Sequence, residues 1–219
     1  MEKVEIFKQL AIGSLTLYRA GLVSGTAGNI SARIPNSKLI AITPSGIAYE
    51  KYSDEMIMCI VDSDGKKVEG RFNPSSETPM HTILLRSLTH VNAIVHTHSP
   101  FATAIGCTGG YVPVMGLEGL HFGADKILTT DGFVLPGSDQ MGYRVLDTLN
   151  KSPNSKAVLL QNHGVVVFGN DVEEAVSLAQ AVEFCAKIYC LAKLVGTPHE
   201  LTHEEIQKSL EHYASKRMA

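Results

Sequence analysis

The sequence predicts a layered α/β sandwich formed by a single domain that spans residues 1–219. Segments with apolar residues at helical spacing alternate with short strand-like segments, turn residues separate the strands, and no internal repeat is found. With 44% hydrophobic and 19% charged residues, a chain of 219 residues is long enough to bury one sizeable core. The elements follow from the sequence in order.

The first half combines one amphipathic helix with short strands. Apolar residues recur at helical spacing from Glu2 to Ala20, and Gly21 follows as a stop signal. Three strand-like segments come next, at residues 29–34, 38–43 and 56–62. The stretch "DSDGKKVEG" then indicates a hairpin turn with a short return strand.

A second helix is expected in "SSETPMHTILLRSL", where Ser76 can cap the amino terminus and Pro79 lies in the first turn. The apolar strand "AIVHTHSP" follows, and a short helix is expected after Pro100. The Gly-rich residues 107–127 are ambiguous. Beyond them the sequence predicts a helix at 139–150, one buried strand "KAVLLQNHGVVVFG", a long helix at 172–195 and a shorter helix at 203–213.

Charge and composition limit the classes of partner. The formal net charge is -3 and Lys and Arg form no run, which argues against a nucleic-acid partner and favours a small molecule. The four cysteines show no Cys-x-x-Cys spacing, and "MEKVEIFKQL" lacks the apolar core of a signal peptide. No apolar run reaches the roughly 20 residues of a membrane span. We therefore expect a cytoplasmic protein with reduced thiols and no membrane contact.

Histidines interrupt two apolar segments. In a strand His96 and His98 point to the same face, and two neutral imidazoles on one face suit zinc and other borderline metals. Hydrogen bonds or solvent satisfy such a histidine pair about as often as a metal does. A third histidine, His163, interrupts "LLQNHGVVVFG", and each buried imidazole needs a partner for its polar nitrogens. The three together predict a metal site. For the other histidines a structural or solvated role comes first: His81, His90, His121, His199, His203 and His212.

Glu77 is the carboxylate in the most informative context. It begins a predicted helix, where a Glu either interacts with the helix dipole or serves as an acid or base beside the metal. Ser75 and Ser76 precede it, and hydroxyls at a helix amino terminus suit phosphate. Two loops offer similar small donor residues, "SGTAGNISAR" with Thr26 and Asn29, and "ITPSG". Together these segments suggest a site for one phosphate.

The motifs "GLVSGTAGNISAR", "ITPSG", "PSSE", "VHTHSP" and "NHGVVVFG" resemble those of the class II aldolase/adducin family, in the same order and over nearly the whole chain. This family includes L-fuculose-1-phosphate aldolases, L-ribulose-5-phosphate 4-epimerases and methylthioribulose-1-phosphate dehydratases. The resemblance implies a three-layer α/β/α sandwich with a mixed, mostly antiparallel central sheet. It also implies a homotetramer with active sites at subunit interfaces.

The resemblance assigns roles to individual residues. His96, His98, His163 and Glu77 would hold one divalent metal, zinc first and manganese or cobalt as alternatives, and Glu77 would also be the catalytic acid/base. The positions of the phosphate site would be Thr26, Asn29, Thr43, Ser45, Gly46, Ser75 and Ser76. A second proton donor is expected from Tyr213, from His121 or from Glu118, because the loop at 113–127 lacks the tyrosine of the fuculose-phosphate aldolases.

The implied reaction is reversible cleavage of a ketose 1-phosphate to dihydroxyacetone phosphate and an aldehyde. Fuculose 1-phosphate and a 5-deoxypentulose 1-phosphate are the candidate substrates. Glu77 favours cleavage, since the 4-epimerases typically carry Asp at that position. Epimerisation, dehydration or decarboxylation of a sugar phosphate at the same site are alternatives. A non-catalytic scaffold like the adducin head is a further one, against which the retained ligands argue.

Overall fold

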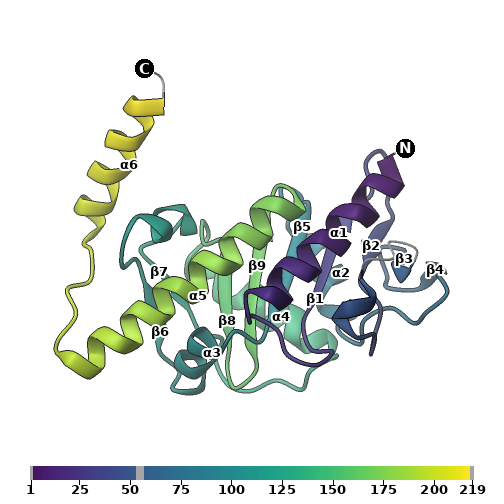
Figure 1. The fold of residues 1–219 in the computed structure, drawn as a ribbon, viewed down its shortest axis with the longest axis horizontal. Helices are drawn as coiled ribbons and strands as arrows, with labels where there is room; N and C mark the ends of the chain where they lie inside the picture. The colour runs from purple at the N-terminus through teal and green to yellow at the C-terminus, as the bar shows by residue number, and fades with distance from the viewer. Residues whose placement is uncertain (1, 53–56, 218–219) are drawn as a thin grey trace.

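A seven-stranded sheet forms the centre of the molecule in the computed structural model, which describes residues 2–52 and 57–217 (Figure 1). Its strand order is β4-β3-β2-β1-β5-β9-β8, and each neighbouring pair in it is antiparallel within the described residues. The strands are β1 (Asn29–Arg33), β2 (Ile40–Ile42), β3 (Cys59–Val61), β4 (Lys67–Glu69), β5 (Ala93–Thr97), β8 (Ala157–Leu160) and β9 (Gly164–Gly169). This sheet is the predicted central layer.

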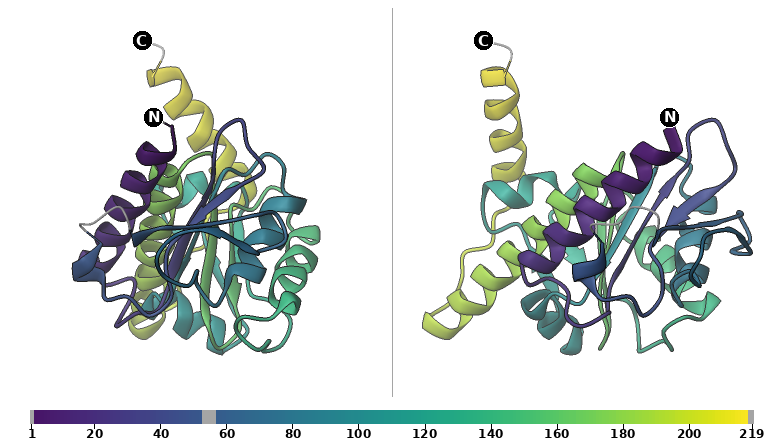
Figure 2. Two further views of the ribbon diagram at one scale, coloured as in Figure 1. Left: turned by 90° about the vertical axis from the view of Figure 1, so that its right-hand side faces the viewer. Right: turned by 45° about the vertical axis from the view of Figure 1, so that its right-hand side comes forward.

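Helices cover both faces of the sheet (Figure 2). One face packs on α1 (Glu2–Arg19), α3 (Pro100–Cys107) and α5 (Val172–Val195), the other on α2 (Thr78–Ser87) and α4 (Asp139–Asn150). Side chains alternate between the two cores along β5, where Val95 faces the first and Ile94 the second. The three-layer α/β/α prediction is therefore confirmed.

Smaller elements extend from one end. The ambiguous Gly-rich segment forms β6 (Tyr111–Pro113), the 3-10 helix η3 (Leu117–Phe122) and β7 (Lys126–Leu128), and β6 pairs with β7. A further 3-10 helix, η1 (Tyr49–Lys51), follows β2. The last helix, α6 (His203–Arg217), extends away from the sheet (Figure 1).

The single strand predicted for residues 156–169 is wrong. The segment forms β8 and β9, an antiparallel hairpin in which Leu160 pairs with Gly164. A continuous apolar run has the same pattern in one long strand as in two buried strands, so periodicity does not separate them. The turn at Asn162, which has a φ of 56°, supplies the missing break, and His163 lies in this turn and not in a strand.

Other predicted boundaries shift by a few residues. Ser76 does not cap α2, whose N-cap is Glu77 without a side-chain hydrogen bond. Strand β5 ends at Thr97, so His98 lies just beyond it. The strand expected at 56–62 is shorter, and Met56 lies outside the described residues, as do Met1, Met218 and Ala219 of the predicted domain.

Helix α5 is more apolar than the sequence analysis assumed. It has 24 residues and a mean hydropathy of 1.4 in its most apolar window, so by length and composition alone it is able to cross a membrane. One face of the helix, which includes Val176, Ala179 and Val182, is buried against the sheet core. Core helices of soluble proteins can have the same length and composition, so the helix gives only weak support for a membrane span.

Candidate metal centre

Four side chains from three parts of the chain meet at one end of the central strands. Glu77 is the N-cap of α2, and His163 lies in the β8–β9 turn. His96 is the penultimate residue of β5, and His98 lies just beyond the strand. One potential ligand atom from each of the four lies within 4.8 Å of the other three. Antiparallel pairing explains the convergence, because it places the end of β5 beside the start of β9.

The contacts within this cluster are short and involve the same atoms. The Nε2 atom of His96 lies 3.0 Å from Oε2 of Glu77 and 3.1 Å from Nε2 of His98. The Nε2 atom of His163 lies 3.3 Å from Oε1 of Glu77. All three imidazoles therefore direct Nε2 toward one small volume beside the carboxylate.

The protonation of His96 makes this arrangement suitable for a cation. Its Nδ1 donates to the carbonyl of Val165 at 2.9 Å, so a neutral His96 carries its lone pair on Nε2. That lone pair faces Glu77 and His98. Among the described residues, the buried Oε1 of Glu77 also has no hydrogen-bond partner. A cation would interact favourably with both the Nε2 lone pair of His96 and Oε1 of Glu77. Three imidazoles with one carboxylate are an ordinary ligand set for a divalent transition metal.

The electrostatics keep the other two imidazoles available as ligands. Burial, assisted by His96, lowers the pKa of His98 and that of His163 to about 4, so both are neutral near pH 7. Burial alone would raise the pKa of Glu77. The proximity of His96, with hydrogen bonds from His96 and Asn29, outweighs burial and holds the pKa of the Glu77 carboxyl below its usual range. His98 and His163 are thus neutral beside an ionised carboxylate, whereas for His96 the effect of burial is outweighed by the charge of Glu77, which raises the pKa.

Gly164 allows the histidine turn to approach β5. A Cβ at this position would lie 2.2 Å from the carbonyl oxygen of Thr97 and 3.1 Å from Cε1 of His96. Any larger residue would push the β8–β9 hairpin away from the strand end. The sequence places Gly where backbone and ring come closest, and this close approach brings His163 to the cluster.

The predicted phosphate positions lie on three neighbouring loops beside the cluster. The backbone N–H of Ser75 donates to the carbonyl of Thr43 at 3.0 Å, and that of Ser45 donates to Asn73 at 2.9 Å. The loop that includes Gly28 packs on β5, where a Cβ would lie 2.9 Å from the carbonyl oxygen of His96. Four of the positions are exposed, namely Thr26, Ser45, Gly46 and Ser76, whereas Thr43 and Ser75 are buried.

The side chain of Asn29, predicted to bind phosphate, already contacts two other side chains. Its Nδ2 donates to Oε2 of Glu77 at 2.9 Å, and its Oδ1 contacts Nε2 of His81. His81 is fully buried, and burial lowers its pKa to about 3. His81 is not among the residues that the sequence predicts for the site. Its spacing from Glu77 was the available signal, because residues four apart share one face of a helix.

The proposed second proton donors lie outside the cluster. His121 and Glu118 are exposed on η3. Tyr213 is exposed on α6, the helix that extends from the body, and its ring packs on His212 at 5.5 Å. Within the part of the chain that the structure describes, none of the three is among the grouped ligand residues.

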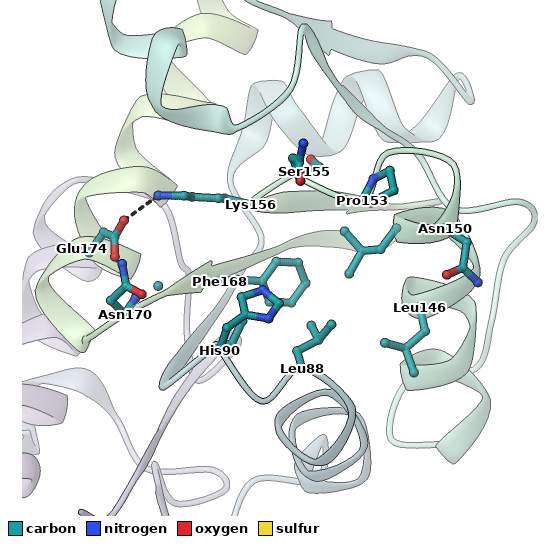
Figure 3. A pocket seen from close by; sticks show the side chains of 14 residues that line it. Leu88, His90, Leu146, Asn150, Pro153, Ser155, Lys156, Phe168, Asn170 and Glu174 are labelled. Carbon is teal, nitrogen blue, oxygen red and sulfur yellow. Dashed lines mark hydrogen bonds and ion pairs between the residues drawn. The ribbon is translucent and has the colours of Figure 1, made fainter. Parts of the chain in front are cut away.

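A separate cavity of about 430 Å³ lies at the opposite end of β9, where Phe168 and Gly169 line it (Figure 3). Lys156 at its rim pairs with Glu174 at 2.7 Å, so the charge of this lysine is already balanced. His90 and Leu88 point toward its interior in Figure 3. The four clustered residues do not line this cavity, so it is distinct from the candidate metal centre.

The fold and the ligand set define a class of protein, an α/β/α sandwich with a His-rich candidate metal site at the ends of inner strands of an antiparallel sheet. Residues 8–190 match the family described as class II aldolase and adducin N-terminal domain. The chain belongs to this family.

Relatives of known function show how far the similarity extends. The chain is 35% identical to a 5-deoxy-D-ribulose 1-phosphate aldolase of Bacillus thuringiensis, covering 86% of this chain and 85% of the relative. It is 33% identical to the L-fuculose phosphate aldolase of Escherichia coli K12, covering 97% and 96%. A solved L-fuculose 1-phosphate aldolase superposes with a TM-score of 0.87 at 30% identity, and the match covers 96% of each chain.

Proposed function

We propose that this chain is a metal-dependent class II aldolase that reversibly cleaves a ketose 1-phosphate to dihydroxyacetone phosphate and an aldehyde. One observation carries the proposal, the convergence of three Nε2 atoms on the carboxylate of Glu77. Two relatives named as aldolases of ketose phosphates support the reaction class. Their names give the two candidate substrates, L-fuculose 1-phosphate and 5-deoxy-D-ribulose 1-phosphate.

His96, His98, His163 and Glu77 would hold one divalent ion. Zinc is the first choice for this ligand set, and manganese and cobalt accept the same donors. When bound, the ion supplies a Lewis acid that stabilises negative charge developing on a substrate oxygen. The three imidazoles are neutral ligands and leave most of the ionic charge available for that purpose. The matching motifs contain no lysine for a Schiff base.

Neutral donors would fix the substrate phosphate. Thr26, Ser45 and Ser76 are exposed residues with hydroxyl groups, and with the exposed Gly46 they lie on adjoining loops, beside Thr43 and Ser75. The amide NH2 of Asn29 has a second hydrogen besides the one it donates to Glu77, and in the same proposal that second hydrogen contacts the substrate. Holding the phosphate at one end determines which carbon–carbon bond lies beside the carboxylate.

Glu77 would move the proton that drives cleavage. Its carboxylate accepts the proton of the hydroxyl on the carbon beyond the scissile bond, and the new aldehyde forms as that bond breaks. The electron pair of the broken bond remains with the fragment that carries the phosphate, and a later protonation of its carbon gives dihydroxyacetone phosphate. The low pKa of Glu77 keeps its carboxylate ionised at neutral pH, so an unprotonated oxygen is present to take the proton.

A second donor would protonate the leaving fragment. Tyr213 is the first candidate, with His121 and Glu118 as alternatives. Because α6 extends from the body, we propose that Tyr213 serves the site of a neighbouring subunit in a homotetramer. Exposed apolar residues on α5 suit such an assembly: Phe184, Ile188, Leu191 and Leu194. A cytoplasmic location is part of the same proposal.

The test incubates metal-loaded protein with L-fuculose 1-phosphate, 5-deoxy-D-ribulose 1-phosphate, L-rhamnulose 1-phosphate and methylthioribulose 1-phosphate. A reductase couples released dihydroxyacetone phosphate to oxidation of a nicotinamide cofactor. We expect release from at least one of them, stopped by a chelator and restored by added zinc. Release from none, with stoichiometric metal bound, would contradict the aldolase and favour epimerisation, dehydration or decarboxylation. A protein that purifies without metal and fails to bind it would indicate a scaffold.

A further inference from the structure

A buried chain of polar groups extends from Glu77 into the interior. It includes Asn29 and Ser31 on β1 and His81 on α2, and all three are buried. The Nδ1 atom of His81 lies 2.6 Å from Oγ of Ser31, and Nε2 contacts Oδ1 of Asn29. His81 therefore lies behind the proposed acid/base, one residue removed from it.

Only one arrangement of donors and acceptors satisfies this series of buried polar groups. An ionised carboxylate only accepts, so Asn29 must turn its NH2 group toward Glu77 and its oxygen toward His81. A carbonyl oxygen only accepts as well, so Nε2 of His81 must carry a hydrogen. The neutral ring then accepts on Nδ1 from the hydroxyl of Ser31.

The opposite tautomer gives a conflict. If Nδ1 of His81 carried the hydrogen, its Nε2 lone pair would require the NH2 group of Asn29. The amide oxygen would then face Oε2 of Glu77, and two acceptors would be in contact in a buried site. An unsatisfied buried pair of this kind is destabilising, because neither acceptor recovers the hydrogen bond that it makes to water. The charge of Glu77 thus selects the tautomer through Asn29, and the hydroxyl of Ser31 is compatible with it because it can donate to Nδ1.

We infer that His81 is a positioning residue for Glu77: its Nε2–H fixes the amide of Asn29, which holds Oε2 of Glu77 and leaves Oε1 to exchange the proton. The two carboxylate oxygens differ in agreement with this. Oε2 accepts from Asn29, whereas the buried Oε1 has no hydrogen-bond partner among the described residues. The role of Oε1 rests on the proposed function, but the tautomer of His81 does not.

The first test observes the tautomer directly. Metal-loaded, [15N]histidine-labelled wild-type protein is examined by two-bond 1H–15N correlation, which separates rings protonated at Nε2 from those protonated at Nδ1. The signals of His81 are those lost in His81→Gln. We expect Nε2–H and a bare Nδ1. The Nδ1–H tautomer would overturn the inference, whether or not the protein proves to be an aldolase.

The second test separates positioning from folding. His81→Leu removes the donor, whereas His81→Gln retains an N–H group at a similar distance along the side chain. We expect His81→Leu to lower kcat by about 10- to 100-fold, in the range of groups that orient metal ligands, with bound metal unchanged. KM should change by less than about threefold, and His81→Gln should recover part of the loss.

Thr82 supplies a matched control. It is the next residue of α2 and it is also buried. Within residues 2–52 and 57–217, its hydroxyl bonds only to the carbonyls of Thr78 and Pro79. Thr82→Val should keep kcat within about twofold. If His81→Leu and His81→Gln lose equal activity in proportion to a lower unfolding temperature, or if both keep wild-type kcat, the positioning role is refuted. Absence of aldolase activity in wild type would refute the proposed function alone.

Discussion

The Glu77 cluster and the α6 region are built on different physical principles. Around Glu77, buried neighbours hold two of the functional side chains: the carbonyl of Val165 holds His96, and Asn29 holds the carboxylate. The proposed second proton donors are exposed, namely Tyr213 on α6 and His121 and Glu118 on η3. Tyr213 contacts its own neighbour His212, and the base of α6 is attached through polar contacts such as Tyr111 and Tyr189 with Glu200.

This difference shows which functional residues a single chain specifies. A buried cluster is complete without a partner, because its geometry follows from strand pairing and close packing. An exposed side chain on an extended helix acquires its neighbours only in an assembly. Substitutions should therefore have their largest effect at the Glu77 cluster and their smallest at Tyr213.

His96→Ala should have the largest effect. It removes the ligand whose Nε2 contacts both Glu77 and His98, and it leaves both of these groups without that partner. We expect bound metal and activity to disappear together, measured by elemental analysis and by release of dihydroxyacetone phosphate. An active variant without stoichiometric metal would contradict the Lewis-acid account.

Glu77→Gln should separate metal binding from catalysis. The amide keeps the size of the side chain but does not accept a proton at neutral pH, so turnover should fall by about 100-fold or more, as for loss of an acid/base group. Folding and most of the metal should remain. Circular dichroism, metal analysis and the coupled assay check the three quantities, and wild-type turnover in this variant would remove Glu77 from the mechanism.

The sequence predicted the layers because amphipathic patterns give helix and strand faces. It predicted α4 and α5 with the bounds seen in the structure, since each is a strongly periodic or strongly apolar segment. It merged β8 and β9, because a tight turn within an apolar run leaves the hydrophobic pattern unbroken. Asn162 with its positive φ is the residue that breaks the strand, and a single Asn is weak as a sequence signal.

The candidate site was predictable in part for the same reason. His96, His98 and His163 stand out because they interrupt apolar runs, and the family resemblance supplied Glu77 as a further ligand. The link through His81 was not predicted, because a buried histidine on a helix is usually satisfied by its local neighbours. Its relation to Asn29 depends on how β1 packs against α2, which spacing along the chain does not give.

Gly164→Ala should loosen the cluster without removing a ligand. The new methyl group would meet the carbonyl oxygen of Thr97 at 2.2 Å, so the hairpin must shift and His163 with it. We expect a cost of about 1–3 kcal/mol in unfolding free energy, typical of overpacking. Metal affinity should fall by about tenfold or more, as for disturbed ligand orientation. Calorimetry and metal titration measure the two effects.

Gly196→Ala is the control for that substitution. This residue follows α5 with an extended φ of 170°, and a Cβ there would meet nothing within 4 Å. Its stability should equal that of wild type or rise by about 0.4–1 kcal/mol, through a less flexible unfolded chain. If Gly164→Ala behaves like this control, the close approach at Thr97 does not limit the site.

Tyr213→Phe should have the smallest effect. We expect turnover to fall by about tenfold, less than the 100-fold or more for Glu77→Gln, because His121 and Glu118 are alternative donors. Bound metal and unfolding temperature should not change. Co-assembled Tyr213→Phe and Glu77→Gln subunits should exceed the mean activity of the two parents, since some sites would combine both wild-type groups from different chains. Activity equal to that mean would place Tyr213 outside a shared site, and the contrast between the two regions would then need another explanation than assembly.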